Sequence, residues 1–334
     1  MDGVLVIDKP VGPTSHDIVA RARRALGESR IGHTGTLDPA ASGVLPLVIG
    51  RATRLARFLS AGDKCYDALI RLGFSTDTGD ALGILLGAEY AGPLPTRESI
   101  DAALDRFRGH FLQQPPVYSA KKIDGHRSHR LARAAARQAP DTAPGTGQST
   151  RSGGSGKAPL PVGVTTHAVV LVSLEGSQVA LHVECSAGFY VRSLAHDLGE
   201  RLGTGAHLVG LRRTRAGDYG LGEAVPIDMV ERDRDAAIAR IVPLDSMLSR
   251  LSPVLLTPEG TKRARHGRDL GPHDILSKPI PTDVARHGET PARNEPAGNE
   301  IDGWVRLLGP EGELVGLAQS AGSSGLLHPS VVLI

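Results

Sequence analysis

Aromatic side chains are scarce in this 334-residue chain: five phenylalanines, five tyrosines and one tryptophan make up only 3% of it. Each aromatic position is therefore informative, because few rings are available for packing or for stacking on a ligand. Cysteine is rarer still. Cys65 and Cys185 lie far apart without metal-ligand spacing around them, which argues against a structural zinc site and is typical of a reducing compartment.

Long apolar runs are also missing, and no stretch is long enough to span a bilayer. The first residues, Met1 to Val4, carry no basic segment of the kind that begins a signal peptide, and the polar Asp8-Lys9-Pro10 follows soon. We therefore expect a cytoplasmic protein with no membrane partner. The 40% hydrophobic and 22% charged residues are typical of a globular protein, and the length predicts two domains or one large domain with an appendage.

The net charge of +2 is too small to predict nucleic-acid binding, but the basic residues are clustered. Basic runs are usually solvated helix faces. Three of them in one nearly neutral chain predict an electropositive surface of the kind that binds a phosphate backbone. The clusters are Lys121, Lys122, Arg127, Arg130, Arg133 and Arg137; Arg212, Arg213 and Arg215; and Arg21, Arg23, Arg24 and Arg30.

Hydrophobic periodicity predicts strands and helices in mixed order, which indicates an α+β protein. We expect a first domain over residues 1–248 and a small β-rich domain over 249–334. Residues 139–161 and 277–300 are rich in small and polar residues and are expected to be flexible insertions. The expected strands are 4–7, 44–49, 64–72, 164–174, 178–185, 207–215, 254–256, 304–308, 314–318 and 331–334; the expected helices are 15–26, 52–59, 96–107, 131–138, 192–202, 233–241 and 258–266.

Residues 30–50 combine several glycines, a histidine and one aspartate ahead of an apolar run that predicts a buried strand. Asp38 is followed by Pro39, which disfavours the helical region at Asp38 and removes the next backbone N–H. The aspartate is therefore expected on a stiff, extended turn, as a carboxylate held for chemistry would be. An isolated Asp-Pro pair is more often only a turn between two elements.

Two further side chains are candidates on their own pattern. Tyr66 shares a strand face with Ala68 and Ile70, so by itself it is a candidate core residue. Arg192 follows an aromatic pair and precedes a predicted helix, and a buried arginine needs a carboxylate partner. Asp38 can be that partner, although sequence spacing alone does not establish the pairing.

The sequence Gly-His-Thr-Gly-Thr-Leu-Asp-Pro-x-Ala-x-Gly-x-Leu-Pro, at residues 32–46, resembles the catalytic motif of the TruB family of tRNA pseudouridine synthases. Four later segments resemble further motifs of that family in the same order, so that the resemblance covers about residues 3–215. The C-terminal part is loosely similar to the family's PUA-type RNA-binding domain. The four segments are 63–80, 115–125, 188–194 and 203–214.

The resemblance implies the pseudouridine synthase fold, with a mixed, mainly antiparallel central sheet, flanking helices and a small C-terminal β domain. It also implies isomerisation of a uridine in the T-loop of tRNA, at position 55, after the nucleotide is flipped out of the T-arm. The reaction breaks the C1′–N1 bond, turns the base and forms a C1′–C5 bond. It involves no net oxidation or reduction, so no cofactor or metal is expected. No obligatory protein partner is expected either.

Roles are implied residue by residue. Asp38 is the catalytic carboxylate, Arg192 pairs with it and keeps it ionised, and Tyr66 stacks on the uracil and helps to remove the C5 proton. The remaining implied site residues are His33 in the gap left by the flipped nucleotide, Tyr190 and Leu211 in the pocket, Lys9 and Arg213 as supports, and Lys121 in a segment that grips RNA.

Three questions stay open at this point. A carboxylate can attack C1′ as a nucleophile or remove a sugar proton as a base, and the sequence does not choose between them. An RNA-binding or tRNA-folding chaperone without catalysis is the main alternative, although pure binding needs no carboxylate facing phosphates. A glycosidase is a weaker alternative, because such enzymes use a pair of carboxylates and only Asp38 is well placed.

Overall fold

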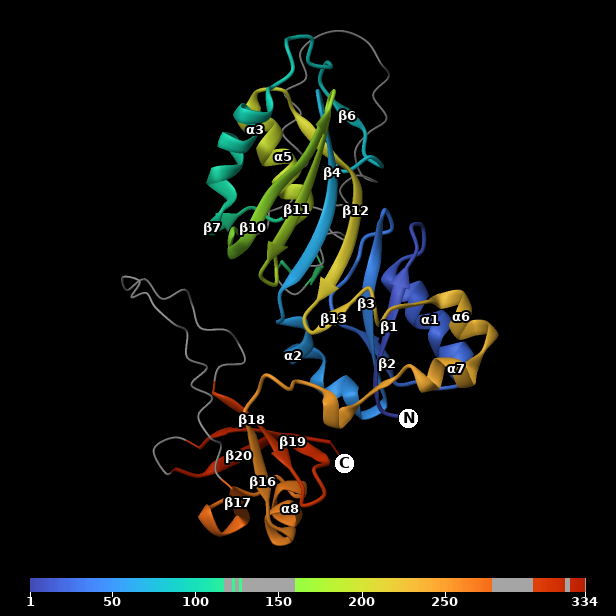
Figure 1. Ribbon diagram of the computed structural model, residues 1–334, viewed down its shortest axis with the longest axis vertical. Helices are drawn as coiled ribbons and strands as arrows, with labels where there is room; N and C mark the ends of the chain where they lie inside the picture. Colours follow the sequence, from blue (N-terminus) through green and yellow to red (C-terminus); the bar gives the residue numbers. More distant parts are fainter. Residues whose placement is uncertain (117–121, 124–125, 128–159, 278–302, 322–324, 334) are drawn as a thin grey trace. The chain divides into compact units, whose positions relative to one another are not determined.

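The computed structural model describes residues 1–116, 122–123, 126–127, 160–277, 303–321 and 325–333 (Figure 1). The chain forms two compact units by internal contacts. The first unit is Met1–Lys64 with Arg213–Ile334, and the second is Cys65–Arg212. The domain boundary between residues 248 and 249 stays a prediction.

The main sheet of the first unit is built on β1, which pairs antiparallel with β3 from Gly3↔Ile49 to Lys9↔Gly43. β2 pairs antiparallel with residues 47–49 of β3, from Ile31↔Ile49 to His33↔Leu47. β3 is buried along nearly its whole length, as its apolar run predicts. The strands of this sheet are β1 (Gly3–Lys9), β2 (Ile31–His33), β3 (Ala41–Ile49), β14 (Val225–Pro226), β15 (Val242–Pro243) and the end of β12 (Ala206–Ala216), beside which lies β13 (Tyr219–Gly220).

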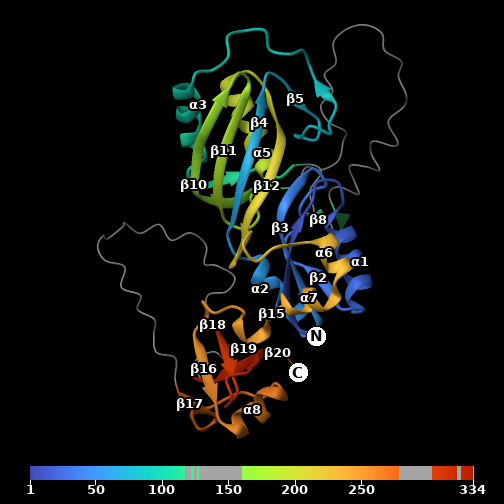
Figure 2. The same ribbon diagram turned by 45° about the vertical axis from the view of Figure 1, so that its right-hand side comes forward.

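Helix α1 (Ser15–Leu26) begins where the sequence predicts, because Thr14 and Asp17 form a capping box. Gly27, with φ 65°, ends it. The helix expected at 233–241 is present as α7 (Arg234–Ala239), which the Asp233 side chain caps, while α6 (Ile227–Arg232) before it is not predicted. Both helices pack against α1 (Figure 2).

A second, smaller sheet with helix α8 (Pro258–Arg265) makes up the C-terminal part of the first unit. The last strand runs over residues 327–332 and not over the expected 331–334. His328, Pro329 and Ser330 are not typical strand residues, so the sequence pattern does not indicate the start of this strand. The strand lies at the edge of the sheet, where such residues are tolerated. The strand order is β17 (Ile275–Ser277), β16 (Pro253–Leu256), β18 (Trp304–Leu308), β19 (Leu314–Ser320) and β20 (Leu327–Val332).

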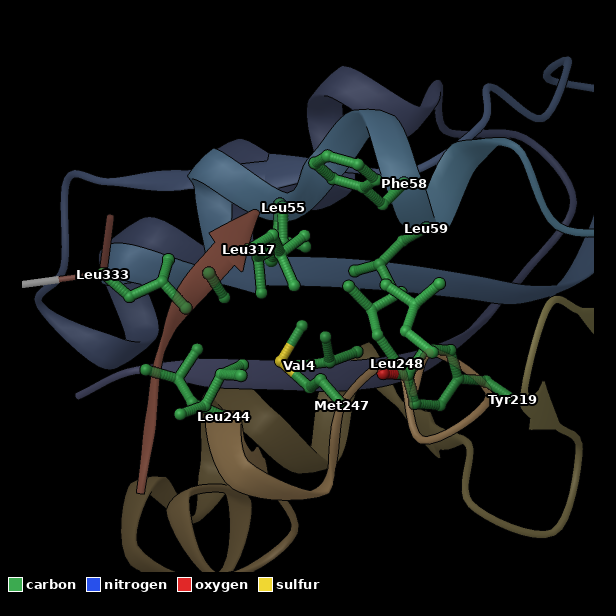
Figure 3. Packing of buried hydrophobic residues seen from close by; sticks show 14 of the residues in the cluster. Val4, Leu55, Phe58, Leu59, Tyr219, Leu244, Met247, Leu248, Leu317 and Leu333 are labelled. Carbon is green, nitrogen blue, oxygen red and sulfur yellow. The ribbon is translucent and has the colours of Figure 1, made fainter. Parts of the chain in front are cut away.

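One buried apolar cluster joins both parts of the first unit (Figure 3). It contains Val4 of β1, Phe58 of α2 (Ala56–Ser60) and Leu317 of β19. The ring of Phe58 lies edge-to-face on that of Trp304, with centroids 4.7 Å apart. The small C-terminal sheet therefore shares a core with the N-terminal strands, besides its own cluster around Leu256 and Leu307.

The second unit is a sheet in the order β12, β4, β11, β10, β7. The predicted hairpin of β10 and β11 is confirmed, with Glu175↔Gln178 at its turn. Helices α3 (Arg97–Leu104) and α5 (Val191–Leu202) pack against each other beside this sheet (Figures 1 and 2). The other strands are β4 (Lys64–Leu72), β7 (Gly109–Gln113), β10 (Val162–Glu175) and β11 (Gln178–Cys185).

Shorter elements complete the described part of the chain. The helix expected at 96–107 is α3 followed by a 3-10 turn, and the one expected at 52–59 is a 3-10 turn followed by α2. These short elements are η1 (Gly50–Leu55), η2 (Asp105–Phe107), η3 (Leu244–Ser246), η4 (Pro272–Asp274), β5 (Ser75–Thr76), β6 (Leu85–Leu86), β8 (Lys122–Ile123) and β9 (His126–Arg127). The helix expected at 131–138 and nearly all of the two predicted insertions lie outside the described residues.

The described elements form an α+β protein with a mixed, mainly antiparallel main sheet and a C-terminal β domain, as predicted. Parallel pairing occurs at β1 with β14 and at β16 with β18, among antiparallel pairs. No helix within the described residues is long and apolar enough to cross a membrane.

Candidate active site

Asp38 lies in the loop that joins β2 to β3 in the first unit. The loop leaves β2 immediately after His33, where the Thr34 N–H donates to the Pro46 carbonyl at 3.1 Å. It returns through a turn in which the Ala41 N–H donates to the Asp38 carbonyl at 3.0 Å. The half-buried Asp38 is thus on a hydrogen-bonded turn, as the Asp-Pro pair predicts.

Lys9 supports this loop from β1 and is fully buried. Its Nζ donates to the carbonyls of Pro10 and Ala41, each at 2.8 Å. The pKa of Lys9 is lowered to about 8, mainly by burial; the charge of Asp38 partly opposes this shift, and the charge of Arg213 adds to it. Because Asp38 influences Lys9 electrostatically, the ammonium and the carboxylate belong to one local site.

Arg213 supports the loop from β12 and is only 1% exposed. Its Nε donates to the Val44 carbonyl at 2.7 Å and its Nη2 to the Gly35 carbonyl at 3.1 Å. The strand passes so near that a Cβ on Gly43, which has φ +103°, would lie 2.1 Å from the Arg213 carbonyl oxygen. This arginine therefore belongs to the interior, and the expectation that its whole cluster lines an exposed basic surface is wrong at this position.

His33 is half-buried at the end of β2. Its ring meets that of His16, an exposed residue in the first turn of α1, edge-to-face at 5.3 Å between centroids. His33 directly precedes the loop that carries Asp38, so the two imidazoles lie beside that loop. His16 was not among the residues singled out from the sequence.

In the second unit, Tyr66 lies on β4 and is only 9% exposed. Its face is shared by Ala68, Ile70 and Leu72, which are all buried, so the predicted alternation of this strand is confirmed. Leu211, on β12, is half-buried. Lys121 lies outside the described residues.

Tyr190 is half-buried and immediately precedes α5. The side-chain amide of Gln113, a residue that is 1% exposed, binds both the backbone N–H and the carbonyl of Tyr190. The Gln113 amide nitrogen donates to the Tyr190 carbonyl at 3.0 Å, and the amide oxygen accepts from the Tyr190 N–H at 2.8 Å. Gln113 fixes the start of the helix that carries Arg192, a role that local periodicity does not reveal.

Arg192 is 8% exposed at the start of α5. Its Nη1 donates to the Thr78 carbonyl at 3.0 Å and lies 3.9 Å from Oδ2 of Asp80. The other carboxylate oxygen of Asp80 accepts from the Thr78 hydroxyl at 2.7 Å and from the Leu82 N–H at 3.1 Å. Thr78 and Asp80, which belong to the motif segment 63–80, thus hold the arginine. The sequence does not predict this contact.

The structure therefore brings Lys9, Asp38 and Arg213 together in the first unit. In the second unit it places Tyr190 and Arg192 at the start of one helix, where Gln113 and Asp80 hold them. Asp38 belongs to one unit and Tyr66 and Arg192 to the other, so the pairing of Asp38 with Arg192 stays a prediction.

Comparison with known proteins identifies the class. The family model "TruB family pseudouridylate synthase (N terminal domain)" matches residues 23–143, and the model "tRNA pseudouridylate synthase B C-terminal domain" matches residues 192–249. In three dimensions the chain is similar to a protein in the crystal structure of a Cbf5-Nop10-Gar1 complex, with a TM-score of 0.67 and 24% identity over 99% of this chain and 85% of that one. The fold is thus the pseudouridine synthase fold.

Curated relatives agree along the full length. The chain is 38% identical over 335 aligned residues to the tRNA pseudouridine synthase B of Solibacter usitatus, covering all of both proteins. It is 37% identical to the tRNA pseudouridine synthase B of Cupriavidus metallidurans, covering 98% of this chain and 92% of the relative. The chain belongs to the TruB family of pseudouridylate synthases. It is an RNA-binding isomerase of that family, which acts on uridine in tRNA.

Proposed function

We propose that this enzyme converts the T-loop uridine of tRNA, position 55, to pseudouridine, with Asp38 as the catalytic carboxylate. The observation that carries the proposal is the fixed loop around Asp38, whose two flanks are held by the buried cations of Lys9 and Arg213. A carboxylate kept in one geometry is suited to react at a sugar carbon. An RNA-folding chaperone, the alternative function, needs only a charged surface.

The chemistry requires two bond changes at the same nucleotide. The C1′–N1 bond breaks, the uracil turns within the pocket, C5 bonds to C1′, the proton on C5 leaves and N1 takes up a proton, so that the product is an isomer of the substrate. Asp38 serves as the nucleophile at C1′ or as the base that removes a sugar proton, and either role needs its ionised form. No redox step occurs, so the residues of the chain and the RNA supply all the atoms that react.

Arg192 and Tyr66 complete the proposed site. The Thr78 carbonyl and Asp80 hold the Arg192 guanidinium through Nη1, and a planar guanidinium is suited to bind a carboxylate. Pairing with Arg192 favours the ionised form of Asp38. Tyr66 stacks on the uracil and helps to remove the C5 proton, on a strand whose buried neighbours keep its ring in place.

A uridine within a folded loop must leave its stack to reach a side chain in a pocket. His33 then fills the space left in the T-arm, and Tyr190 and Leu211 line the pocket for the flipped base. Lys121 grips the RNA backbone. We place the enzyme in the cytoplasm and propose no obligatory protein partner.

The catalytic role of Asp38 is tested with Asp38→Asn, which keeps the size of the side chain and removes the charge. We expect proton release from C5-labelled uridine in tRNA to fall at least about a thousandfold. The affinity for tRNA should stay within about twofold, because phosphate contacts dominate binding. Filter binding and single-turnover tritium release measure the two quantities.

The matched control is Asp228→Asn, which removes an exposed carboxylate of α6 that pairs with Arg21. This variant should release tritium at the wild-type rate. Equal release by Asp38→Asn and wild type would refute the catalytic assignment. A tRNA whose T-loop uridine is replaced by cytidine tests the position, because it should yield no pseudouridine with the active enzyme.

A further inference from the structure

Ser15, the first residue of α1, contacts the chain immediately before Asp38. Its hydroxyl donates to the Leu37 carbonyl at 3.0 Å and accepts from the Leu37 N–H at 2.9 Å. Ser15 is 1% exposed and Leu37 is 3% exposed, so both hydrogen bonds are shielded from water. One hydroxyl thus satisfies both backbone polar groups of the residue before Asp38.

The helix does not need this hydroxyl for its own start. Thr14 is the N-cap, and its hydroxyl accepts from the Asp17 N–H at 3.1 Å. The Asp17 carboxylate accepts in return from the Thr14 N–H at 2.8 Å. Because this capping box already satisfies the helix terminus, the Ser15 side chain acts toward the loop and not toward its own helix.

Two more contacts from the same segment hold the other side of Asp38. The Gly12 N–H donates to the Pro39 carbonyl at 2.8 Å, and Lys9 Nζ donates to the Ala41 carbonyl at 2.8 Å. Residues 9–15 therefore bind the loop at Leu37, Pro39 and Ala41, one residue before Asp38 and one and three residues after it. The backbone of Asp38 has little freedom to move while these contacts last.

We propose that Ser15 is a positioning residue that fixes the direction of the Asp38 carboxylate by clamping Leu37. This inference rests on the proposed catalytic role of Asp38. Without the hydroxyl, both polar groups of Leu37 lose their partner in a buried place, and the loop must shift to reach water or another group. A displacement of about 1 Å at a reacting group can lower a rate by roughly a hundredfold.

Three variants separate the hydrogen bonds from the volume of the side chain. Ser15→Ala removes both hydrogen bonds, Ser15→Cys fills the space with a weak donor and acceptor, and Ser15→Thr keeps the hydroxyl. The matched control is Ser60→Ala in α2 of the same unit, which removes a hydroxyl that donates to the Ala56 carbonyl at 2.8 Å. Single-turnover pseudouridine formation, KM for tRNA and the melting temperature are measured for each.

We expect Ser15→Ala and Ser15→Cys to lower kcat roughly tenfold to a hundredfold while KM stays within about twofold. Ser15→Thr should restore most of the rate. Ser60→Ala should keep the wild-type kcat. If Ser15→Ala does not fold, the comparison of Ser15→Cys with Ser15→Thr decides the question, because both fill the site.

A wild-type kcat in Ser15→Ala or Ser15→Cys overturns the inference, and so does a loss of rate in Ser15→Thr equal to that in Ser15→Cys. The proposed function is judged separately by Asp38→Asn. If Asp38→Asn is inactive while Ser15→Cys is fully active, only the positioning role fails. If Asp38→Asn is active, the proposed function fails whatever the Ser15 variants do.

Discussion

Lys9 combines complete burial with a charge, which is rare for lysine. Its ammonium group donates to two backbone carbonyls and lies in the field of Asp38, but these contacts do not fully replace water. Burial therefore lowers the pKa of Lys9 from 10.5 to about 8. The buried side chain holds the loop that carries Asp38.

The lowered pKa predicts how stability changes with pH. Below pH 8, Lys9 is charged in both the folded and the unfolded chain. Between about pH 8 and 10.5 the unfolded chain binds the proton while the folded one has released it, so raising the pH favours the folded state. Relative to Lys9→Met, the wild-type free energy of unfolding should rise by about 1–3 kcal/mol from pH 7 to pH 10.

Urea unfolding of wild type and Lys9→Met at several pH values measures this difference. Lys262→Met in α8 is the matched control, since the Lys262 side chain is 71% exposed. The difference between wild type and Lys262→Met should stay flat over the same range. If the difference in the free energy of unfolding between wild type and Lys9→Met is also independent of pH, the surroundings of Lys9 do not disfavour its charge.

Asp80 lies in the loop between β5 and β6 and joins that loop to Arg192. Asp80 accepts hydrogen bonds from Thr78 and Leu82 and lies beside the Arg192 guanidinium. Both side chains of the ion pair are largely buried, at 8% and 13% exposure. An ion pair in such a place fixes the arginine more firmly than a surface pair would.

We expect Asp80→Asn to lower kcat about tenfold, equivalent to about 1.4 kcal/mol in the activation barrier. The asparagine oxygen keeps the acceptors for Thr78 and Leu82, so the loop should stay folded, but the charge beside Arg192 is gone. Single-turnover assays and tRNA binding measure the effect, and affinity should change little.

Asp77→Asn is the control for that prediction. Asp77 is exposed in the same loop and its carboxylate accepts from the Ile84 N–H at 2.7 Å, with no contact to Arg192 among the described interactions. Its kcat should equal that of wild type. If Asp80→Asn has the same kcat as Asp77→Asn and wild type, the charge of Asp80 is not needed to hold Arg192 for catalysis.

The sequence predicts well those elements whose signal is local. The start of α1, the alternation of β4 and the two strands joined by the turn at residues 175–178 all appear as expected, because periodicity and turn chemistry act over a few residues. The first residues of the edge strand β20 and the six-residue helix α6 are not predicted, because polar or short segments carry little periodic signal.

Supports of the site were harder to predict than its reactive residues. A motif marks Asp38 and Arg192 directly. The contacts of Ser15 with Leu37 and of Asp80 with Arg192 join segments that are distant in sequence, and no local pattern records which backbone group a side chain reaches. For Arg213 the basic cluster predicts an exposed side chain, whereas the family resemblance implies a support; the side chain is 1% exposed and donates to the carbonyls of Gly35 and Val44.

At the scale of the molecule, the small C-terminal sheet is held to the N-terminal strands by a shared core. Trp304, Leu314 and Leu317 belong to the same buried cluster as Val4 and Phe58. Polar contacts reinforce it, since Arg51 donates to the Leu333 carbonyl at 2.9 Å and the Leu314 N–H donates to the Asp245 carboxylate at 2.7 Å. The sheet therefore contributes to the stability of the first unit.

Trp304→Ala tests this coupling without removing the sheet. Loss of a buried indole leaves a cavity against Phe58, and we expect the free energy of unfolding to fall by about 3–5 kcal/mol. Deletion from Ser252 onward should be more damaging, because it uncovers the whole apolar surface around Val4 and Phe58. Circular dichroism melts measure stability, and pseudouridine formation at low temperature reports whether the remaining folded enzyme is active.

Leu276→Ala is the matched control, since Leu276 lies in the same small sheet on β17 but is 58% exposed. Its melting temperature should stay near that of wild type. If the two sheets were independent, Trp304→Ala would leave a separate unfolding transition of wild-type midpoint for the N-terminal strands. A shared core predicts instead that this transition moves together with that of the C-terminal sheet, because removing one ring weakens both faces of the same apolar cluster.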